Sequence, residues 1–226
     1  MAGNRVVAID GPAGSGKTTT AREVARRLGW VHLDSGALYR AVTLAALDAD
    51  VPPDDPLRVV ALTGQLPIRW VFAVDAFKPE VAGTDVTQAI RSLRVTAQVS
   101  AYASLPQVRD WVNQELRHAA ERAPSGVVIE GRDIGTVVFP DAGVKVFLTA
   151  RPETRAARRL AQEGKAEDMG SVRRRSRELV RRDDADARRD VAPLRAAPDA
   201  VTMDTTDLSF EEQVDRVVTL ARQALA

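Results

Sequence analysis

The chain has 226 residues, no cysteine and a formal net charge of +1 at pH 7. This length is enough for a full hydrophobic core, and the lack of cysteine excludes a disulfide scaffold. No apolar run approaches the roughly 20 residues of a membrane helix, and the first predicted strand begins too early to leave room for a signal peptide. The near-zero net charge gives no general attraction to nucleic acid. We therefore expect a cytoplasmic protein with neither nucleic acid nor membrane as a partner.

A glycine-rich segment near the N-terminus, Gly11–Thr18, fits the pattern G-x-x-x-x-G-K-[ST] at every fixed position. The strand pattern of Val6–Ile9 precedes it, and apolar residues at helical spacing follow it. Such a loop turns backbone N–H groups toward a polyphosphate, while its lysine neutralises phosphate oxygens and its threonine offers a hydroxyl to Mg²⁺. The segment predicts an ATP site with Mg²⁺ as cofactor, bound through Thr18. The predicted ATP-binding residues are Gly11, Pro12, Ala13, Gly14, Ser15, Gly16, Lys17, Thr18 and Thr19.

The next segment repeats the alternation of strand and helix. Residues 30–34 have a strand pattern and residues 37–47 a helical one, which predicts a parallel sheet with helices on both faces. Ligands of such sheets lie at the carboxyl ends of the strands, where Asp34 and Ser35 are expected. A helix-capping role explains Ser35 as well as a ligand contact does, and Arg40 fits either a surface arginine or a ligand contact.

The middle of the chain departs from this alternation. A turn-rich linker with a short helix at 57–62 leads to two predicted strands, 68–74 and 80–86, of a small antiparallel insert. Helices are expected at 87–103 and 106–121. Trp111 falls on the apolar stripe of the second helix, which favours a place in the core over a cofactor contact.

Charged residues follow the next predicted strand, 126–129, without any spacer. They are Glu130, Arg132 and Asp133, and at a strand's carboxyl end they would face the ligand crevice. Neighbouring side chains point apart, so we do not expect Arg132 and Asp133 to pair with each other. The position favours a functional role over packing.

After a strand at 144–148, the segment from 151 to 190 is rich in arginine and poor in large apolar residues. It predicts a mobile helical hairpin over the site, with most of its arginines solvated. Arg182, Asp186 and Arg189 are spaced i, i+4, i+7 and share one helical face. Spacing alone is compatible with a surface ion-pair ladder and with a ligand-binding face. A last strand at 200–203 and a helix after the capping box Ser209–Glu212 close the chain.

Four stretches together resemble the bacterial cytidylate kinase family: Asp10–Lys17, Leu33–Arg40, Glu130–Pro140 and Arg182–Asp186. The similarity covers essentially the whole chain, and the insert resembles the enlarged acceptor-binding region of the family's long members. It implies an α/β P-loop NTPase fold, three-layered (α/β/α), with a five-stranded parallel core sheet, a small antiparallel insert and a helical lid. It also implies a single domain. Its parts would be a core of residues 1–62, 120–150 and 191–226, a nucleoside-monophosphate-binding region of residues 63–119, and a lid region of residues 151–190.

The resemblance further implies an ATP-dependent kinase of CMP and dCMP that acts as a monomer. Its catalytic residues would be Lys17, Arg132, Arg182 and Arg189. Of the CMP-binding residues, Ser35, Arg40, Arg132 and Arg189 would lie near the phosphate, Ser100, Arg109 and Asp133 would read the cytosine, and Arg182 and Asp186 would serve the sugar and the acceptor phosphate region. The assignments of Ser100 and Arg109 rest on a short pattern. The sequence Ala187–Arg189 leaves the neighbouring lid arginines partly interchangeable.

The chemistry of phosphoryl transfer agrees with this residue set. Two phosphorylated substrates must be held in line and their charge neutralised, and guanidinium groups suit phosphate oxygens. A carboxylate at Asp133 would accept a hydrogen bond from the amine of cytosine and repel the carbonyl of uracil. Another small-molecule P-loop kinase, of the adenylate, shikimate or dephospho-coenzyme A type, is the nearest alternative. A nucleotide switch or binding module is the other, but the guanine-reading N-K-x-D motif is absent from the sequence.

Overall fold

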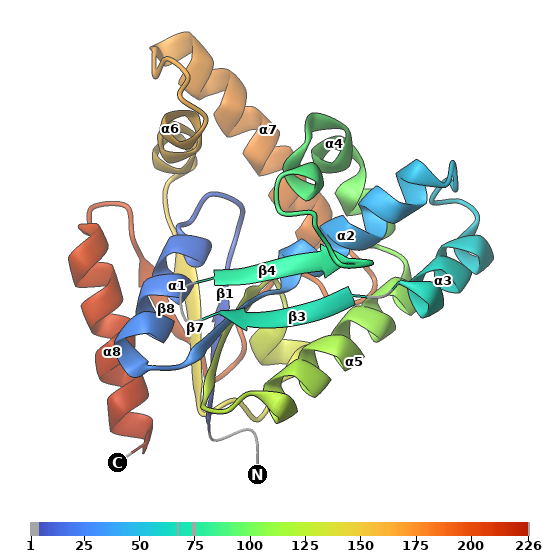
Figure 1. Cartoon of the computed structure of the whole chain (residues 1–226). Coiled ribbons are helices and arrows are strands. Elements are labelled where there is room, and N and C mark those ends of the chain that lie inside the picture. The colour runs from blue at the N-terminus through green and yellow to red at the C-terminus, as the bar shows by residue number, and fades with distance from the viewer. Residues whose placement is uncertain (1–4, 67, 74–75, 226) are drawn as a thin grey trace.

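The computed structural model of the chain describes residues 5–66, 68–73 and 76–225 (Figure 1). Five parallel strands form the central sheet in the order β2-β6-β1-β7-β8. This arrangement confirms the predicted five-stranded parallel core. The strands are β1 (Val6–Asp10), β2 (Val31–Asp34), β6 (Val127–Gly131), β7 (Val144–Thr149) and β8 (Val201–Asp204).

The two central strands are buried along their whole length. Every residue of β1 and β6 is buried, as their continuous apolar sequences require in a sheet covered on both faces. Their carboxyl ends, Asp10 and Gly131, are paired in register, so the segments that follow both strands begin side by side. The sheet thereby brings the glycine-rich loop and the Glu130–Asp133 segment to one edge.

Helices cover both faces of the sheet (Figure 1). On one face, Leu33, Leu38, Leu116 and Ile129 belong to the larger core, and Trp111 packs against it as predicted. On the other face, the helix after the glycine loop and the C-terminal helix enclose a second core. The helices of the first face are α2 (Ser35–Asp48), α3 (Pro56–Gln65) and α5 (Pro106–Arg122), and those of the second are α1 (Lys17–Leu28) and α8 (Phe210–Leu225).

The predicted antiparallel insert is present as a three-stranded sheet. It consists of β3 (Ile68–Ala73), β4 (Ala76–Val81) and β5 (Thr84–Asp85), so the expected strand at 80–86 is divided between two strands. Val74, expected in the first strand, lies outside the described residues. The single helix predicted for 87–103 is wrong. A short 3₁₀ turn, η2 (Ala89–Arg91), is separated from α4 (Leu93–Tyr102) by Ser92, whose ψ of 157° is incompatible with a continuous helix.

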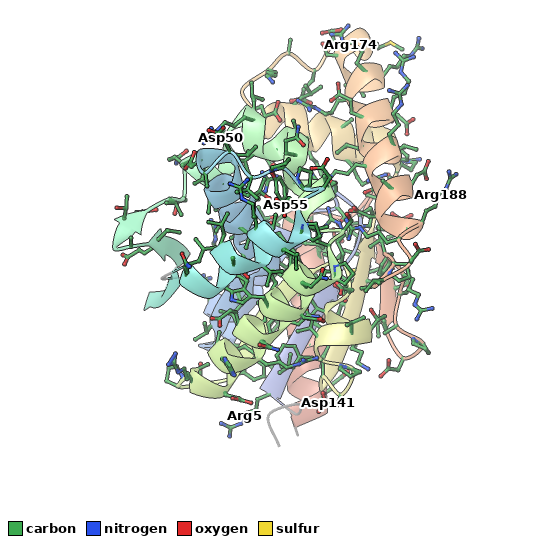
Figure 2. The ribbon with its side chains drawn as sticks, turned by 90° about the vertical axis from the view of Figure 1, so that its right-hand side faces the viewer. Arg5, Asp50, Asp55, Asp141, Arg174 and Arg188 are labelled. Carbon is green, nitrogen blue, oxygen red and sulfur yellow. The ribbon has the colours of Figure 1, made fainter. Side chains whose placement is uncertain are left out.

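Two helices, α6 (Pro152–Gln162) and α7 (Met169–Ala187), form the hairpin predicted for the arginine-rich segment. The hairpin lies beyond the carboxyl edge of the sheet. Figure 2 shows Arg174 near its far end and Arg188 near its base, both pointing outward. The inner side of the hairpin is not solvated, because Arg155, Ala156 and Leu179 are buried there. No helix among the described residues is long and apolar enough to cross a membrane.

Candidate active site

The glycine loop joins the end of β1 to α1, and its backbone depends on three glycines with positive φ. Gly11 has a φ of 147°, and a Cβ there would lie 2.0 Å from the carbonyl oxygen of Leu148 on β7. Gly14 has a φ of 76°, and Gly16, which caps α1, has a φ of 93°. Larger residues would be strained at all three positions. The resulting loop is a phosphate cradle in front of a helix N-terminus, as the motif predicts.

Lys17, the first residue of α1, is 7% exposed and donates a hydrogen bond from Nζ to the carbonyl oxygen of Pro12 at 2.7 Å. Burial, and then the positive charge of Arg132, lowers the pKa of Lys17 to about 7. The ammonium is therefore held without enough negative charge around it. An anion bound in the loop would therefore strongly stabilise the charged form of Lys17.

A carboxylate faces the loop threonine from the neighbouring strand. Thr18 Oγ1 donates to Glu130 Oε2 at 2.8 Å, and His32 Nε2 lies 3.1 Å from Glu130 Oε1. Burial acts to raise the pKa of Glu130, but the hydrogen bond and charge of His32, followed by the charge of Lys17, hold that pKa below its usual range. An acid at the end of the strand beside a P-loop, close to the P-loop hydroxyl, is the arrangement that holds Mg²⁺ in P-loop NTPases.

The Thr18 hydroxyl and the Glu130 carboxylate fit the chemistry of Mg²⁺, which prefers hard oxygen donors and keeps several waters. In the part of the chain that the structure describes, no group of three or more His, Cys, Asp or Glu side chains could hold a metal. The sequence placed Glu130 at the crevice without giving it this role. His32 lay in an unremarkable context, because its contact depends on the pairing of β2 with β6.

Arg132 links α7 to the glycine loop. Its Nε donates to Asp186 Oδ2 at 2.9 Å and its Nη1 donates to the carbonyl oxygen of Gly11 at 3.1 Å. Arg189 Nη2 donates to the other carboxylate oxygen of Asp186, which is only 2% exposed. Since α7 ends at Ala187, Arg189 reaches this carboxylate from beyond the helix rather than from its face. Three predicted site residues are thus in direct contact.

Two further arginines join this cluster through their charge. Arg182 has a buried Nε with no hydrogen-bond partner among the described residues, and burial together with the charge of Arg132 lowers its pKa to about 10. Arg40 donates from Nη1 to Thr96 Oγ1 at 2.8 Å and to the carbonyl oxygen of Ile90 at 3.1 Å, and burial lowers its pKa. The site concentrates cations that repel one another.

A second ion pair lies deeper, on the side of α5. Arg109, 2% exposed, donates from Nη2 to the carboxylate of Asp133, which is 3% exposed. The guanidinium carbon of Arg109 also lies 5.5 Å from the centre of the Tyr39 ring. Arg132 and Asp133 therefore pair with other residues and not with each other, as expected. The structure brings together two of the three residues predicted to read the cytosine.

The segment that carries Asp133 is fixed by a buried carboxylate on β1. Asp10 accepts hydrogen bonds from the N–H groups of Ile134 at 2.9 Å and Gly135 at 2.8 Å. These residues begin the π-helical turn η3 (Ile134–Val138), which periodicity did not predict. Burial raises the pKa of Asp10 to about 6 against the effect of those two hydrogen bonds. The turn holds Asp133 at the end of β6.

The two serines predicted to bind CMP, Ser35 and Ser100, differ in their hydrogen bonds. Ser35 is buried and its Oγ donates to the carbonyl oxygen of Glu130 at 2.7 Å, so the hydroxyl fastens the start of α2 to β6. The cap of α2 is Asp34, whose Oδ1 accepts from the N–H of Ala37 at 3.1 Å. Ser100 lies half-buried on α4, and no hydrogen bond that the structure describes joins it to Arg109 or Asp133.

The strand order, the phosphate loop after β1 and the arginine-rich hairpin beside it define a P-loop phosphotransferase of the small-molecule kinase class. The sequence matches the family described as cytidylate kinase over residues 7–223. The chain belongs to the cytidylate kinase family. This match does not favour the alternatives of an adenylate, shikimate or dephospho-coenzyme A kinase.

Several proteins named cytidylate kinase are similar over nearly their full length. The one from Streptomyces avermitilis is 44% identical over 223 residues, with 98% of this chain and 94% of the relative covered. The Azotobacter vinelandii protein is 46% identical, with 94% and 93% covered. The Mycobacterium avium protein is 45% identical, with 99% and 97% covered. The likeness therefore includes the loop, the insert and the lid segment alike.

Proposed function

We propose that the protein transfers the γ-phosphoryl group of ATP to CMP or dCMP, giving CDP or dCDP. The observation that carries this proposal is the cluster of buried cations at the carboxyl edge of the sheet. Burial and the charge of Arg132 lower the pKa of Lys17 to about 7 and that of Arg182 to about 10. Such shifts indicate a site that lacks anions, and two phosphorylated substrates would supply them.

The donor side is the glycine loop. Its backbone N–H groups and Lys17 would bind the ATP phosphates, while Thr18 and Glu130 would hold Mg²⁺. Held there, Mg²⁺ would offset the negative charge of the phosphates. The chain's own contribution is orientation and charge, since an acceptor phosphate is already anionic and requires no general base.

The acceptor side is the arginine cluster beside the loop. Arg132 and Arg189, both held by Asp186, would grip the acceptor phosphate, and Arg40 would join them after leaving its contacts on Thr96 and Ile90. Arg182, whose Nε has no described partner, would bind the phosphoryl group in transfer. Guanidinium groups suit this task because they donate in a bidentate fork.

The buried pair of Arg109 and Asp133 would select the base, with Ser100 beside it. A carboxylate favours the exocyclic amine of cytosine and opposes the carbonyl that uracil presents at that position. Arg182 and Asp186 would also serve the sugar. The lid, residues 151–190, would exclude water that otherwise accepts the phosphoryl group, while residues 63–119 would bind the monophosphate.

An acceptor panel tests the proposal directly. ADP formation from ATP and Mg²⁺ is measured with CMP, dCMP, UMP, AMP, shikimate and dephospho-coenzyme A, and without acceptor as the control. We expect CMP and dCMP to give the highest kcat/KM. A higher value for AMP, shikimate or dephospho-coenzyme A would reject the assignment. We also propose that the protein acts as a monomer in the cytoplasm, and light scattering on the purified protein tests the monomer.

A further inference from the structure

The phosphate loop and the lid hairpin share a set of polar contacts centred on Ala13. The N–H of Ala13 donates to Asp183 Oδ1 at 2.9 Å, and the carbonyl oxygen of Ala13 accepts from Arg155 Nη1 at 2.8 Å. The same Nη1 also donates to Asp183 Oδ2. One loop residue, one residue of α6 and one residue of α7 therefore form a closed ring of hydrogen bonds. We call these three residues the clasp.

Apolar contacts reinforce the clasp from the other side. Ala13 packs in a small buried cluster with Ala156 of α6 and Leu179 of α7, which Val172 adjoins. The neighbouring Gly14 lies so close to α6 that a Cβ there would be 3.1 Å from the backbone oxygen of Arg155. The hairpin is thus packed directly on the loop. Its attachment does not depend on the solvated arginines of its outer face.

The clasp pairs a buried arginine with a half-buried carboxylate. Arg155 is 5% exposed and also donates from Nε to the carbonyl oxygen of Ala150 at 3.1 Å, so its guanidinium has one carboxylate partner and two carbonyl partners. Removing the only carboxylate partner of a buried guanidinium strongly destabilises the folded state, because a buried charge is left uncompensated. Asp183 is therefore the carboxylate that joins α7 to both Arg155 and Ala13.

The position of Asp183 in α7 gives the clasp a consequence for the reaction. It directly follows Arg182, the arginine with the unpartnered buried Nε. Asp186, one turn further on, is tied through Arg132 to the carbonyl oxygen of Gly11. The helix is therefore fastened to two residues of the phosphate loop on the turn that carries Arg182.

We propose that Asp183 is a positioning residue: with Arg155 it fixes α7 on Ala13 and so holds Arg182 over the phosphate loop. This inference rests on the proposed function, which places the transferred phosphoryl group at Arg182. Asp183 itself touches the loop backbone and not a substrate. Its removal changes the placement of Arg182, while the contacts of Lys17 and Thr18 in the phosphate loop remain.

The test compares Asp183→Asn with Asp184→Asn. Both substitutions remove one carboxylate from the same turn of α7, but Asp184 is exposed and makes no side-chain contact among those the structure describes. For Asp183→Asn we expect kcat to fall by about 10- to 100-fold, because a misplacement of about 1 Å in a transfer site costs on the order of 100-fold. The KM for ATP should change by less than about threefold, since the ground-state contacts of the phosphate loop persist. Asp184→Asn should match the wild type.

Two further measurements separate positioning from a general loss of fold. At a temperature well below the melting temperature of both variants, trypsin should cleave the arginine-rich α7 faster in Asp183→Asn than in Asp184→Asn. In the wild type without nucleotide, NMR should show slow hydrogen exchange at the Ala13 amide, because this N–H is bonded to Asp183. The exchange measurement needs no variant, and so it stands if Asp183→Asn fails to fold.

The inference is overturned if Asp183→Asn and Asp184→Asn have equal kcat and equal cleavage rates, or if the Ala13 amide exchanges at the rate of an unprotected amide. A fall in kcat with a proportional rise in the KM for ATP would also contradict it. If the wild type fails to phosphorylate CMP, the proposed function fails. Amide exchange and trypsin cleavage still decide whether the clasp exists.

Discussion

The buried ammonium of Lys17 leads to a prediction about stability as well as activity. The fall of its pKa from 10.5 to about 7 corresponds to about 5 kcal/mol by which the ligand-free native state is penalised below pH 7. Lys17→Met keeps a side chain of similar length without a charge. It loses the hydrogen bond to the carbonyl oxygen of Pro12, which costs about 1–3 kcal/mol. We expect the variant to be more stable by about 3 kcal/mol at pH 6.5 and inactive.

The pH dependence gives the sign of the effect. Between pH 7 and 10.5 the unfolded chain keeps the proton of Lys17 while the native state gives it up, so the wild-type native state gains stability as the pH rises. Lys17→Met has no such group. The stability advantage of the variant should therefore be full below pH 7, shrink by about 1.4 kcal/mol per pH unit above it, and vanish at about pH 9, where the remaining penalty equals the lost hydrogen bond.

Thermal or urea unfolding of both proteins from pH 6 to pH 9.5 measures this difference. At pH 6.5 an advantage of about 3 kcal/mol would raise the melting temperature by roughly 6–12 °C for a chain of this length. ATP with Mg²⁺ should raise the melting temperature of the wild type only. A variant that is less stable than the wild type at pH 6.5, or a difference that stays constant up to pH 9.5, would refute the argument. Wild-type turnover in the variant would refute the assignment of Lys17 to ATP.

Three further outcomes follow from the site. Arg132→Ala should remove about 2–4 kcal/mol of transition-state stabilisation, as for other removed transition-state donors, and so lower kcat/KM for CMP. A loss of less than about tenfold in steady-state kinetics would contradict its role. Wild-type kcat/KM should be higher for CMP than for UMP because Asp133 is a carboxylate, and equal values would remove that argument. Glu130→Gln should weaken Mg²⁺ binding in the presence of ATP, measured as a higher half-saturating Mg²⁺ concentration; an unchanged value would exclude Glu130 as a ligand.

The parts of the fold that the sequence predicted are those with local signals. The loop of Gly11–Thr18 follows from fixed residue types between a strand and a helix, and the alternation around it predicts the parallel sheet. The break at Ser92 was not predicted. Ser92 is the N-cap residue of α4, and the buried residues on its two sides, Ile90 and Val95, are five positions apart, which does not fit one continuous helical face.

The site residues also separate into those that the sequence predicted and those that only the structure shows. Arg132, Asp186 and Arg189 were predicted through resemblance, and the structure places them in contact. Arg155 was missed because it is one of many arginines in a segment that composition alone assigns to solvent. Only the folded hairpin shows that its guanidinium lies against Ala13. The contact between Glu130 and His32 likewise requires the register of β2 on β6, which the sequence does not contain.

The guanidinium of Arg132 touches the carbonyl oxygen of Gly11 on one side and the carboxylate of Asp186 on the other. On the proposed function, this one guanidinium would be shared between the nucleotide that donates and the nucleotide that receives. If occupation of one side moves Arg132, the two affinities become interdependent. By thermodynamic linkage, the factor by which ATP changes the affinity for CMP must equal the factor by which CMP changes the affinity for ATP.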